Sequence, residues 1–321
     1  MKKIYYLIFL LLTSLRSYCW GFYMHEKINY HAVFLLPPQM MILFKPNIGF
    51  LSEHAVDPDK RRYMIASEGA HHFIDIDHYG QYPFPEVPRD YKSAILKFSA
   101  DSLQAYGIVP WWIQIMVGRL TKAFREKDKQ AILKIAADLG HYIADAHVPL
   151  HVCSNHNGQL THQEGIHAFW ESRVPEIFAE TEWDFFIGKA MYIPNLSSFI
   201  WDRILESAVA ADTVLHCEKE ISVLTNPEQK YAFEERNGKI VKQYSTEYAT
   251  LFESRLNHMI ERRMRQSIFA VASCWYTAWV NAGQPPLDHL VHDSLFISEE
   301  KEYQRLNLEW KNGKILGRNC N

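Results

Sequence analysis

The sequence predicts an all-α protein that forms a single domain of many helices. Apolar residues recur at intervals of three and four along almost the whole chain, which is typical of helices with one buried face. Alternation of apolar and polar residues, which would indicate strands, is scarce, and no glycine/serine linker or internal repeat divides the 321 residues. With 48% hydrophobic and 22% charged residues, the chain has enough apolar material for one large core.

The first 19 residues are predicted to be a signal peptide rather than part of the fold. Lys2 and Lys3 precede an apolar run at positions 4–12, and a polar stretch ending at Cys19 follows. The run is about half as long as a helix that spans a bilayer. Small residues lie three and one positions before Trp20, which favours cleavage there and export to the periplasm or the extracellular space. An N-terminal anchor that is never cleaved is the alternative.

The net charge bears on which ligands the protein can bind, and the number of cysteines bears on its disulfides. The full chain has a formal net charge of −3, and cleavage would remove three of its 34 basic residues and none of its 37 acidic ones. This acidic balance argues against binding polyanions through bulk charge. Four cysteines remain after cleavage, in a compartment where disulfides persist, but their spacing does not reveal the pairing: Cys153, Cys217, Cys274 and Cys320.

The best-defined helix is predicted over residues 128–146. Its apolar residues form one stripe at helical spacing: Ile132, Ile135, Ala136, Leu139 and Ile143. Pro149 is expected to stop this helix, because proline has no N–H and clashes with the preceding turn. A second helix is predicted over residues 165–173 and is expected to end before Pro175.

A long helix is predicted over residues 246–280, and the run from Asn281 to Gly283 followed by two prolines ends it. Its buried side is expected to carry Leu251, Leu256, Met259, Ile260, Ile268, Val271, Cys274 and Trp275. Asn237-Gly238 is read as a turn. The polar residues 286–321 are expected to form a peripheral tail of the domain 20–321.

Histidines and carboxylates occur at metal-ligand spacing in the second quarter of the mature chain. His141 and Asp145 are four residues apart on one predicted helix, so their side chains share a face. His167 and Glu171 repeat this spacing on the next helix, and His151 lies between the two pairs. Zn²⁺ readily takes histidine nitrogens and carboxylate oxygens. Two such pairs and a third histidine favour a metal cluster between two helices over paired surface charges.

Further candidate ligands lie upstream. Asp57 and Asp59 are alternatives for one carboxylate ligand, and His71 and His72 are alternatives for one imidazole. Near the expected mature N-terminus, His25 follows Trp20 by five residues. Cleavage before Trp20 would free an α-amine that can chelate a metal together with the carbonyl oxygen of the same residue.

Taken together, these residues resemble the superfamily of zinc-dependent phospholipase C and the single-strand-specific nucleases of the S-one/P-one type. The matching positions run in order from Trp20 to Glu171 and include the pattern His-x-x-x-Asp-x-x-x-Pro-x-His from His141 to His151. The metal ligands that the resemblance implies are Trp20, His25, Asp57, His72, His141, Asp145, His151, His167 and Glu171.

The resemblance implies two to three zinc ions per chain. One ion would be held by Asp57, His72, His141 and Asp145, a second by Trp20, His25 and Asp145, and a third by His151, His167 and Glu171. Asp145 would then bridge two ions. Asp59 and His71 remain the rival candidates for the places of Asp57 and His72.

The chemistry implied by the resemblance is phosphodiester hydrolysis by a metal-bound hydroxide, with Asp57 as a catalytic residue that orients the attacking water. Phe73, Asp75 and Lys60 are the expected substrate contacts. Glu171 in place of aspartate and the short interval from His151 to His167 favour a phospholipase C-like substrate. A single-strand nuclease (endonuclease or 3′-nucleotidase) and a non-catalytic zinc-binding protein are the alternatives. A monomer without an obligate protein partner is expected.

Overall fold

The computed structural model describes residues 21–236, 238–291 and 297–318, and it confirms a mostly α-helical fold. The helices in the described part are α1 (Phe22–Val33), α2 (Pro38–Phe44), α3 (Ile48–Glu53), α4 (Asp57–Arg61), α5 (Tyr91–Phe98), α6 (Ala100–Tyr106), α7 (Val109–Glu126), α8 (Lys129–His147), α9 (Ile166–Ala168), α10 (Val174–Phe178), α11 (Leu196–Leu224), α12 (Thr246–Arg255), α13 (Met259–Asn281) and α14 (Ile297–Asn312). Short helical turns connect them, and none of the described helices is long and apolar enough to cross a membrane.

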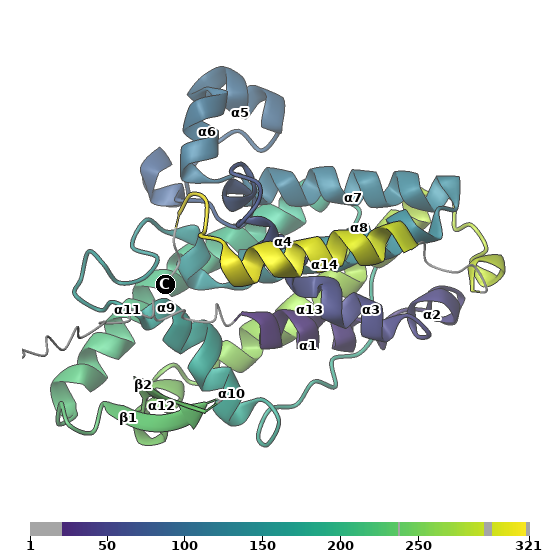
Figure 1. Cartoon of the computed structure of the whole chain (residues 1–321). Coiled ribbons are helices and arrows are strands. Elements are labelled where there is room, and N and C mark those ends of the chain that lie inside the picture. Colours follow the sequence, from purple (N-terminus) through teal and green to yellow (C-terminus); the bar gives the residue numbers. More distant parts are fainter. Residues whose placement is uncertain (1–20, 237, 292–296, 319–321) are drawn as a thin grey trace, which may run out of the picture.

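Helix α8 lies at the centre of the fold (Figure 1). The Asp128 side chain caps its start by accepting a hydrogen bond from the Ala131 N–H, at 3.0 Å. Helices α7, α13, α1 and α3 pack around α8, and from residue 136 to its end every residue of α8 is buried. The predicted stripe therefore forms only one side of a helix that is enclosed all round in its second half, where His141 and Asp145 lie.

The Asn29 side chain of α1 packs directly against α8 at Gly140. The Asn29 side chain donates hydrogen bonds to the carbonyl oxygens of Leu51 (2.9 Å) and Ala137 (3.1 Å), and it occupies the space where residue 140 would carry a Cβ. A Cβ built on Gly140 would lie 1.8 Å from Asn29 Oδ1. This glycine lets α1 bring His25 close to α8.

We expect Gly140→Ala to lower the free energy of unfolding by about 1–3 kcal/mol, because either Asn29 or the helix pair must shift. Thermal or denaturant unfolding measures the effect. Gly118→Ala in α7 is the matched control: apart from its chain neighbours and the backbone of its own helix, no atom lies within 4 Å of its Cβ position, so the same change should be neutral or stabilise by up to about 1 kcal/mol. Equal effects at the two positions would contradict the close approach.

The structure corrects three details of the predicted elements. The expected helix over 246–280 is two helices, α12 and α13, separated where Asn257 and His258 adopt positive φ angles of 50° and 56°. The helix expected over 165–173 continues past Pro175 into α10 through a π-helical turn, η5 (Phe169–Arg173). A hairpin of β1 (Tyr231–Arg236) and β2 (Lys239–Tyr244) flanks the predicted turn and was missed.

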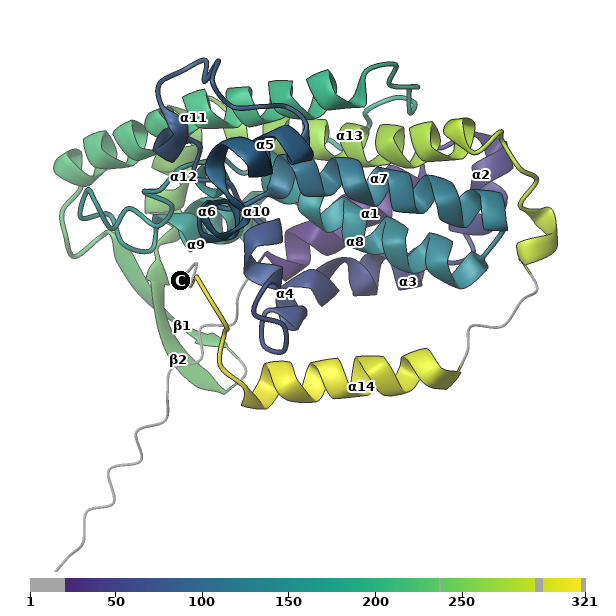
Figure 2. The same ribbon diagram turned by 90° about the horizontal axis from the view of Figure 1, so that it is seen from above.

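The described part of the expected peripheral tail packs against the helical body. Helix α14 packs along α4, and Figure 2 shows it lying beside α3 and α4 with the following segment turning back toward α9. The Tyr303 ring stacks on His54 with centroids 3.6 Å apart, and Trp310 contacts Phe22 at 5.2 Å. The tail therefore covers the helix that carries Asp57 and Asp59.

Candidate metal centre

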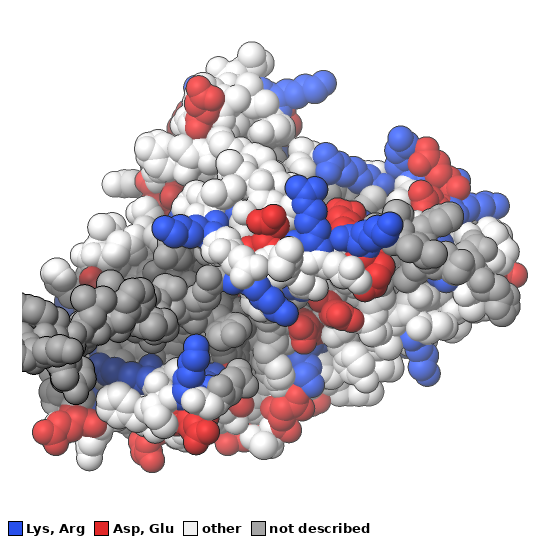
Figure 3. Space-filling model, in the orientation of Figure 1, with Lys and Arg blue, Asp and Glu red and all other residues white. Residues whose placement is uncertain are grey.

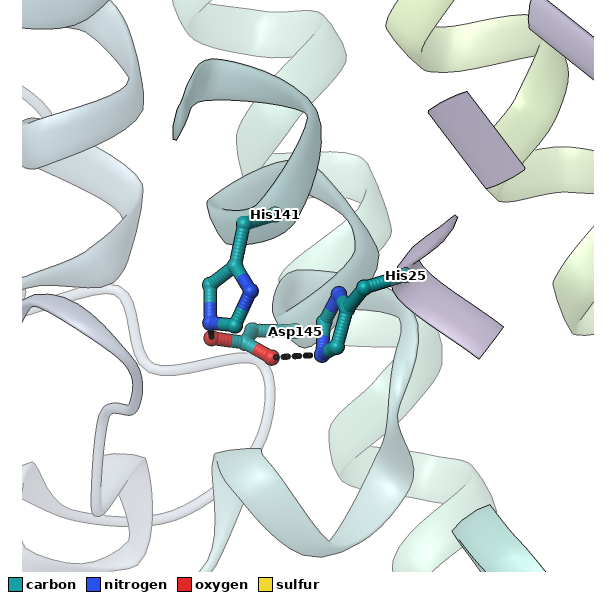
Figure 4. A group of neighbouring side chains, drawn as sticks. All are labelled: His25, His141 and Asp145. Carbon is teal, nitrogen blue, oxygen red and sulfur yellow. Dashed lines mark ion pairs between the residues drawn. The ribbon is translucent and has the colours of Figure 1, made fainter. Parts of the chain in front are cut away.

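Three groups of imidazole and carboxylate atoms lie close together at the end of α8, and two of them share His141. Within each group the ligating atoms lie within 4.8 Å of one another. The groups are Asp59, His72 and His141; His25, His141 and Asp145; and His151, His167 and Glu171. Figure 4 shows Asp145 with His141 from the same helix on one side and His25 from α1 on the other.

The first group gathers around one oxygen of Asp145. Asp145 Oδ2 lies 3.0 Å from His72 Nδ1 and 3.3 Å from His141 Nε2, and these two nitrogens are 3.0 Å apart. Asp59 Oδ1 lies 3.7 Å from His72 Nδ1 and 3.9 Å from His141 Nε2. Donor atoms about 2.0–2.1 Å from a tetrahedral zinc ion are roughly 3.3 Å apart. Asp59, His72 and His141 thus have donor atoms spaced to hold one ion, and Asp145 Oδ2 lies beside both nitrogens.

The second group uses the other oxygen of Asp145. Asp145 Oδ1 lies 3.4 Å from His25 Nε2, while the His25 and His141 rings stack with centroids 3.8 Å apart. Glu171 Oε1 lies 3.7 Å from the same His25 nitrogen. Because its two oxygens face different histidines, Asp145 is placed to join two metal positions.

The third group lies where η4 (Pro149–Val152) meets α9 and η5. His167 Nε2 is 2.9 Å and His151 Nε2 is 3.8 Å from Glu171 Oε2. The π-helical turn widens the helix between His167 and Glu171, yet both side chains remain on one side. Such turns are common at functional sites.

Backbone carbonyls hold three of the histidines in orientation. The Nδ1 atoms of His141, His151 and His167 are bonded to the carbonyl oxygens of Ala55 (2.8 Å), His72 (2.7 Å) and His156 (3.0 Å). Donation from Nδ1 leaves each Nε2 lone pair directed at the cluster. Metal-binding histidines are typically fixed in this way.

Buried charges set the protonation states of the donors. Burial and the neighbouring His141 lower the pKa of His25 to about 4, so this ring is neutral near pH 7. Although burial favours the neutral form of His141, Asp145 and Asp59 raise its pKa to about 9. The pKa of Asp145 stays well below its ordinary value despite burial, because His141 and His151 stabilise the carboxylate. A bound cation would displace the proton of His141 and take over its role beside the carboxylates.

The structure places Asp59 in the cluster, whereas Asp57, the ligand and catalytic residue expected from sequence, lies outside it. Asp57 Oδ2 lies 2.8 Å from His54 Nδ1, and its Oδ1 lies 3.4 Å from Lys60 Nζ. Two residues apart on α4, the aspartates point to opposite sides because each residue turns the helix by about 100°. The rival histidine assignment is resolved in favour of His72, since the His71 ring instead stacks on Trp112 at 3.7 Å.

The three expected substrate contacts do not present free side chains. Lys60 is buried between Asp57 and the Trp310 ring of α14, which lies 5.9 Å from its Nζ, so it faces away from the cluster. Phe73 is buried, and the Arg318 guanidinium lies 4.0 Å above its ring. Asp75 forms an ion pair with the same arginine.

Glu68 lies beside the cluster but was not among the residues expected from the sequence. Glu68 lies at the far side of His72, with Oε1 3.8 Å from His72 Nε2, and it accepts a hydrogen bond from Tyr142. Its position four residues before His72 is a signal that could have been used. Asp138, three residues before His141, pairs with Arg61 at 2.9 Å.

The proposed N-terminal ligand, Trp20, lies outside the described residues. The next residue, Gly21, is buried against the cluster: a Cβ built on it would lie 3.0 Å from Glu171 Oε1 and 3.2 Å from the His25 ring. Its φ of −46° is accessible to any residue, so only space excludes a side chain here.

We expect Gly21→Ala to weaken metal binding roughly tenfold, as changes next to metal ligands commonly do, because the added methyl group pushes His25 and Glu171 apart. Competition with a chelator measures this affinity. Gly49→Ala in α3 is the control, since nothing lies within 4 Å of its Cβ position. An unchanged affinity in Gly21→Ala would show that the cluster tolerates a side chain at this point.

The fold and the cluster define the molecule as a helical protein with a buried, multi-histidine candidate metal centre. No protein-family model matches the chain, and a search of curated proteins finds no significant match. The ligand geometry is therefore the main support for any assignment of function.

Proposed function

We propose that this chain is an exported, zinc-dependent phosphodiester hydrolase with a phospholipase C-like substrate. The observation that carries the proposal is Asp145, a buried carboxylate whose two oxygens face different histidine groups. Paired metal positions joined by a carboxylate are typical of enzymes that transfer phosphoryl groups.

The donor set suits zinc. The residues that would hold the ions are Asp59, His72, His141, Asp145, His25, His151, His167 and Glu171, all with neutral nitrogen or carboxylate oxygen donors and no cysteine. In the described part of the chain His25 Nδ1 is buried without a hydrogen-bond partner, so nothing there holds this ring by its second nitrogen. An ion at Nε2 would fix the ring.

Zinc at such a site lowers the pKa of bound water toward about 7 and neutralises the anionic phosphodiester. The chain's own residues supply the negative charge and the oriented imidazoles that such ions need. Asp59, Asp145 and Glu171 place three negative charges in one buried region, and the backbone carbonyls keep the imidazoles directed inward. The lowered pKa values of Asp59 and Asp145 keep these carboxylates charged.

Two observations favour a phospholipid over a single-stranded nucleic acid. The Phe73 ring, on which a base could stack, is covered by Arg318. On the face seen in Figure 3, basic and acidic side chains are interspersed rather than gathered into a basic track. Proteins that follow a nucleic-acid backbone usually present such a track.

The test is a direct comparison of substrates. Purified protein beginning at Trp20 and loaded with zinc should release a phosphorylated headgroup from phosphatidylcholine vesicles, and chelation should abolish the activity. Cleavage of single-stranded DNA alone would favour the nuclease alternative. Bound zinc without hydrolysis of either substrate would support a non-catalytic zinc-binding protein and contradict the proposal.

A further inference from the structure

The residues that follow α14, here called the clasp segment (residues 313–318), lie against α4. The Leu316 N–H donates to the Arg62 carbonyl oxygen at 2.8 Å, and the Arg62 guanidinium donates to the Arg318 carbonyl oxygen. The Arg62 side chain is only 3% exposed, and its Nη1 lies 3.6 Å from Asp59 Oδ1. One arginine thus connects the backbone of the clasp segment to a proposed metal ligand.

The Arg318 side chain reaches two further segments that carry ligands. Its Nη1 pairs with Asp75, and its guanidinium lies 4.0 Å above the Phe73 ring, directly after His72. Its Nη2 donates to the carbonyl oxygen of Cys153 at 3.3 Å, two residues after His151. The clasp segment therefore contacts the chain within three residues of Asp59, His72 and His151.

These three ligands come from separate parts of the chain, and each lies close to the end of a short helical element. Short elements have little rigidity of their own, so the spacing of their ligands depends on what ties them together. The contacts of the clasp segment are charged and partly buried: the side chains of Arg318 and Asp75 are 15% and 12% exposed. Charge-assisted bonds of this kind are stronger than neutral ones.

We propose that Arg318 is a positioning residue for the metal centre. It ties the segments of His72 and His151 together, while the Arg318 carbonyl oxygen and Arg62 hold Asp59 against them. The clasp segment then retards the separation of ligands that must precede release of a metal ion. This inference rests on the proposed zinc site and adds that metal retention depends on residues outside the ligand set.

The experiment measures how fast zinc leaves the protein when a chelator is added in excess. Arg318→Ala, and separately a chain ending at Asn312, should release zinc at least tenfold faster than the parent protein. Arg318→Lys keeps the pairing charge and should restore part of the retention. Arg255→Ala is the control, since Arg255 makes an equivalent but exposed ion pair with Glu220, between α12 and α11.

The unfolding temperature of the metal-free proteins separates positioning from general stability. Faster release with a metal-free unfolding temperature like that of Arg255→Ala supports the proposal. An unchanged zinc release rate in Arg318→Ala overturns the proposal. A faster release that is accompanied by a proportionate fall in the unfolding temperature of the metal-free variant also overturns it. Zinc binding by the parent protein is measured first. If the parent protein does not bind zinc, the proposed function itself is refuted and the variants are not compared.

Discussion

Asp145→Asn is expected to remove more metal than any other single substitution in the centre. Asp145 Oδ2 lies 3.0 Å from His72 Nδ1 and Oδ1 lies 3.4 Å from His25 Nε2, so one carboxylate serves two groups. Asparagine keeps the shape but replaces one oxygen by an NH₂ group, which cannot bind a cation. It also removes the negative charge that offsets two cations. We expect loss of up to two ions per chain and a fall in activity of at least about 100-fold.

Glu171→Gln is the matched substitution for this prediction. Glu171 belongs to the third group, through His167 and His151, and its approach to His25 is longer, at 3.7 Å. The variant should lose about one ion and retain the others. Elemental analysis of both purified variants measures the difference, and equal metal content would refute the bridging role of Asp145.

The second large effect is expected at Asp59, where the structure departs from the ligand expected from sequence. Asp59→Asn removes the carboxylate beside His72 and His141, and it breaks the buried ion pair between Asp59 and Arg62. Loss of one ion and a fall in activity of about 100-fold should follow. Breaking a buried ion pair adds a stability cost of about 3 kcal/mol or more.

Asp57→Asn tests the same helix from its opposite side. Asp57 contacts His54 and Lys60 rather than the cluster, so this variant should keep its full metal content. A modest loss of stability is expected from the broken pairs. If Asp57→Asn lost an ion while Asp59→Asn kept all of them, the Asp57 side of α4, and not the Asp59 side, would face the metal centre.

Sequence spacing located the donors that lie on well-defined helices. His141 and Asp145 share a face because α8 is a regular helix with a clear apolar stripe and a cap at Asp128. The pair His167 and Glu171 was also predicted to share a face, and it does so on a π-helical turn. On the regular α-helix α8, residues four apart share a face whatever surrounds the helix.

The choice between Asp57 and Asp59 could not be made in this way. Helix α4 has only five residues, so no periodic pattern reveals which side faces inward. The contacts of Arg318 were equally hidden, since they join it to Asp75 and the Cys153 carbonyl across more than 160 positions. The break between α12 and α13 falls at Asn257 and His258, where neither glycine nor proline signals it.

The most direct test is the zinc content of the purified chain beginning at Trp20, determined by elemental analysis without prior exposure to chelators. The three groups around Asp145 and Glu171 predict two to three zinc ions per chain. One ion or fewer would contradict the account of a multinuclear centre, whatever the substrate proves to be.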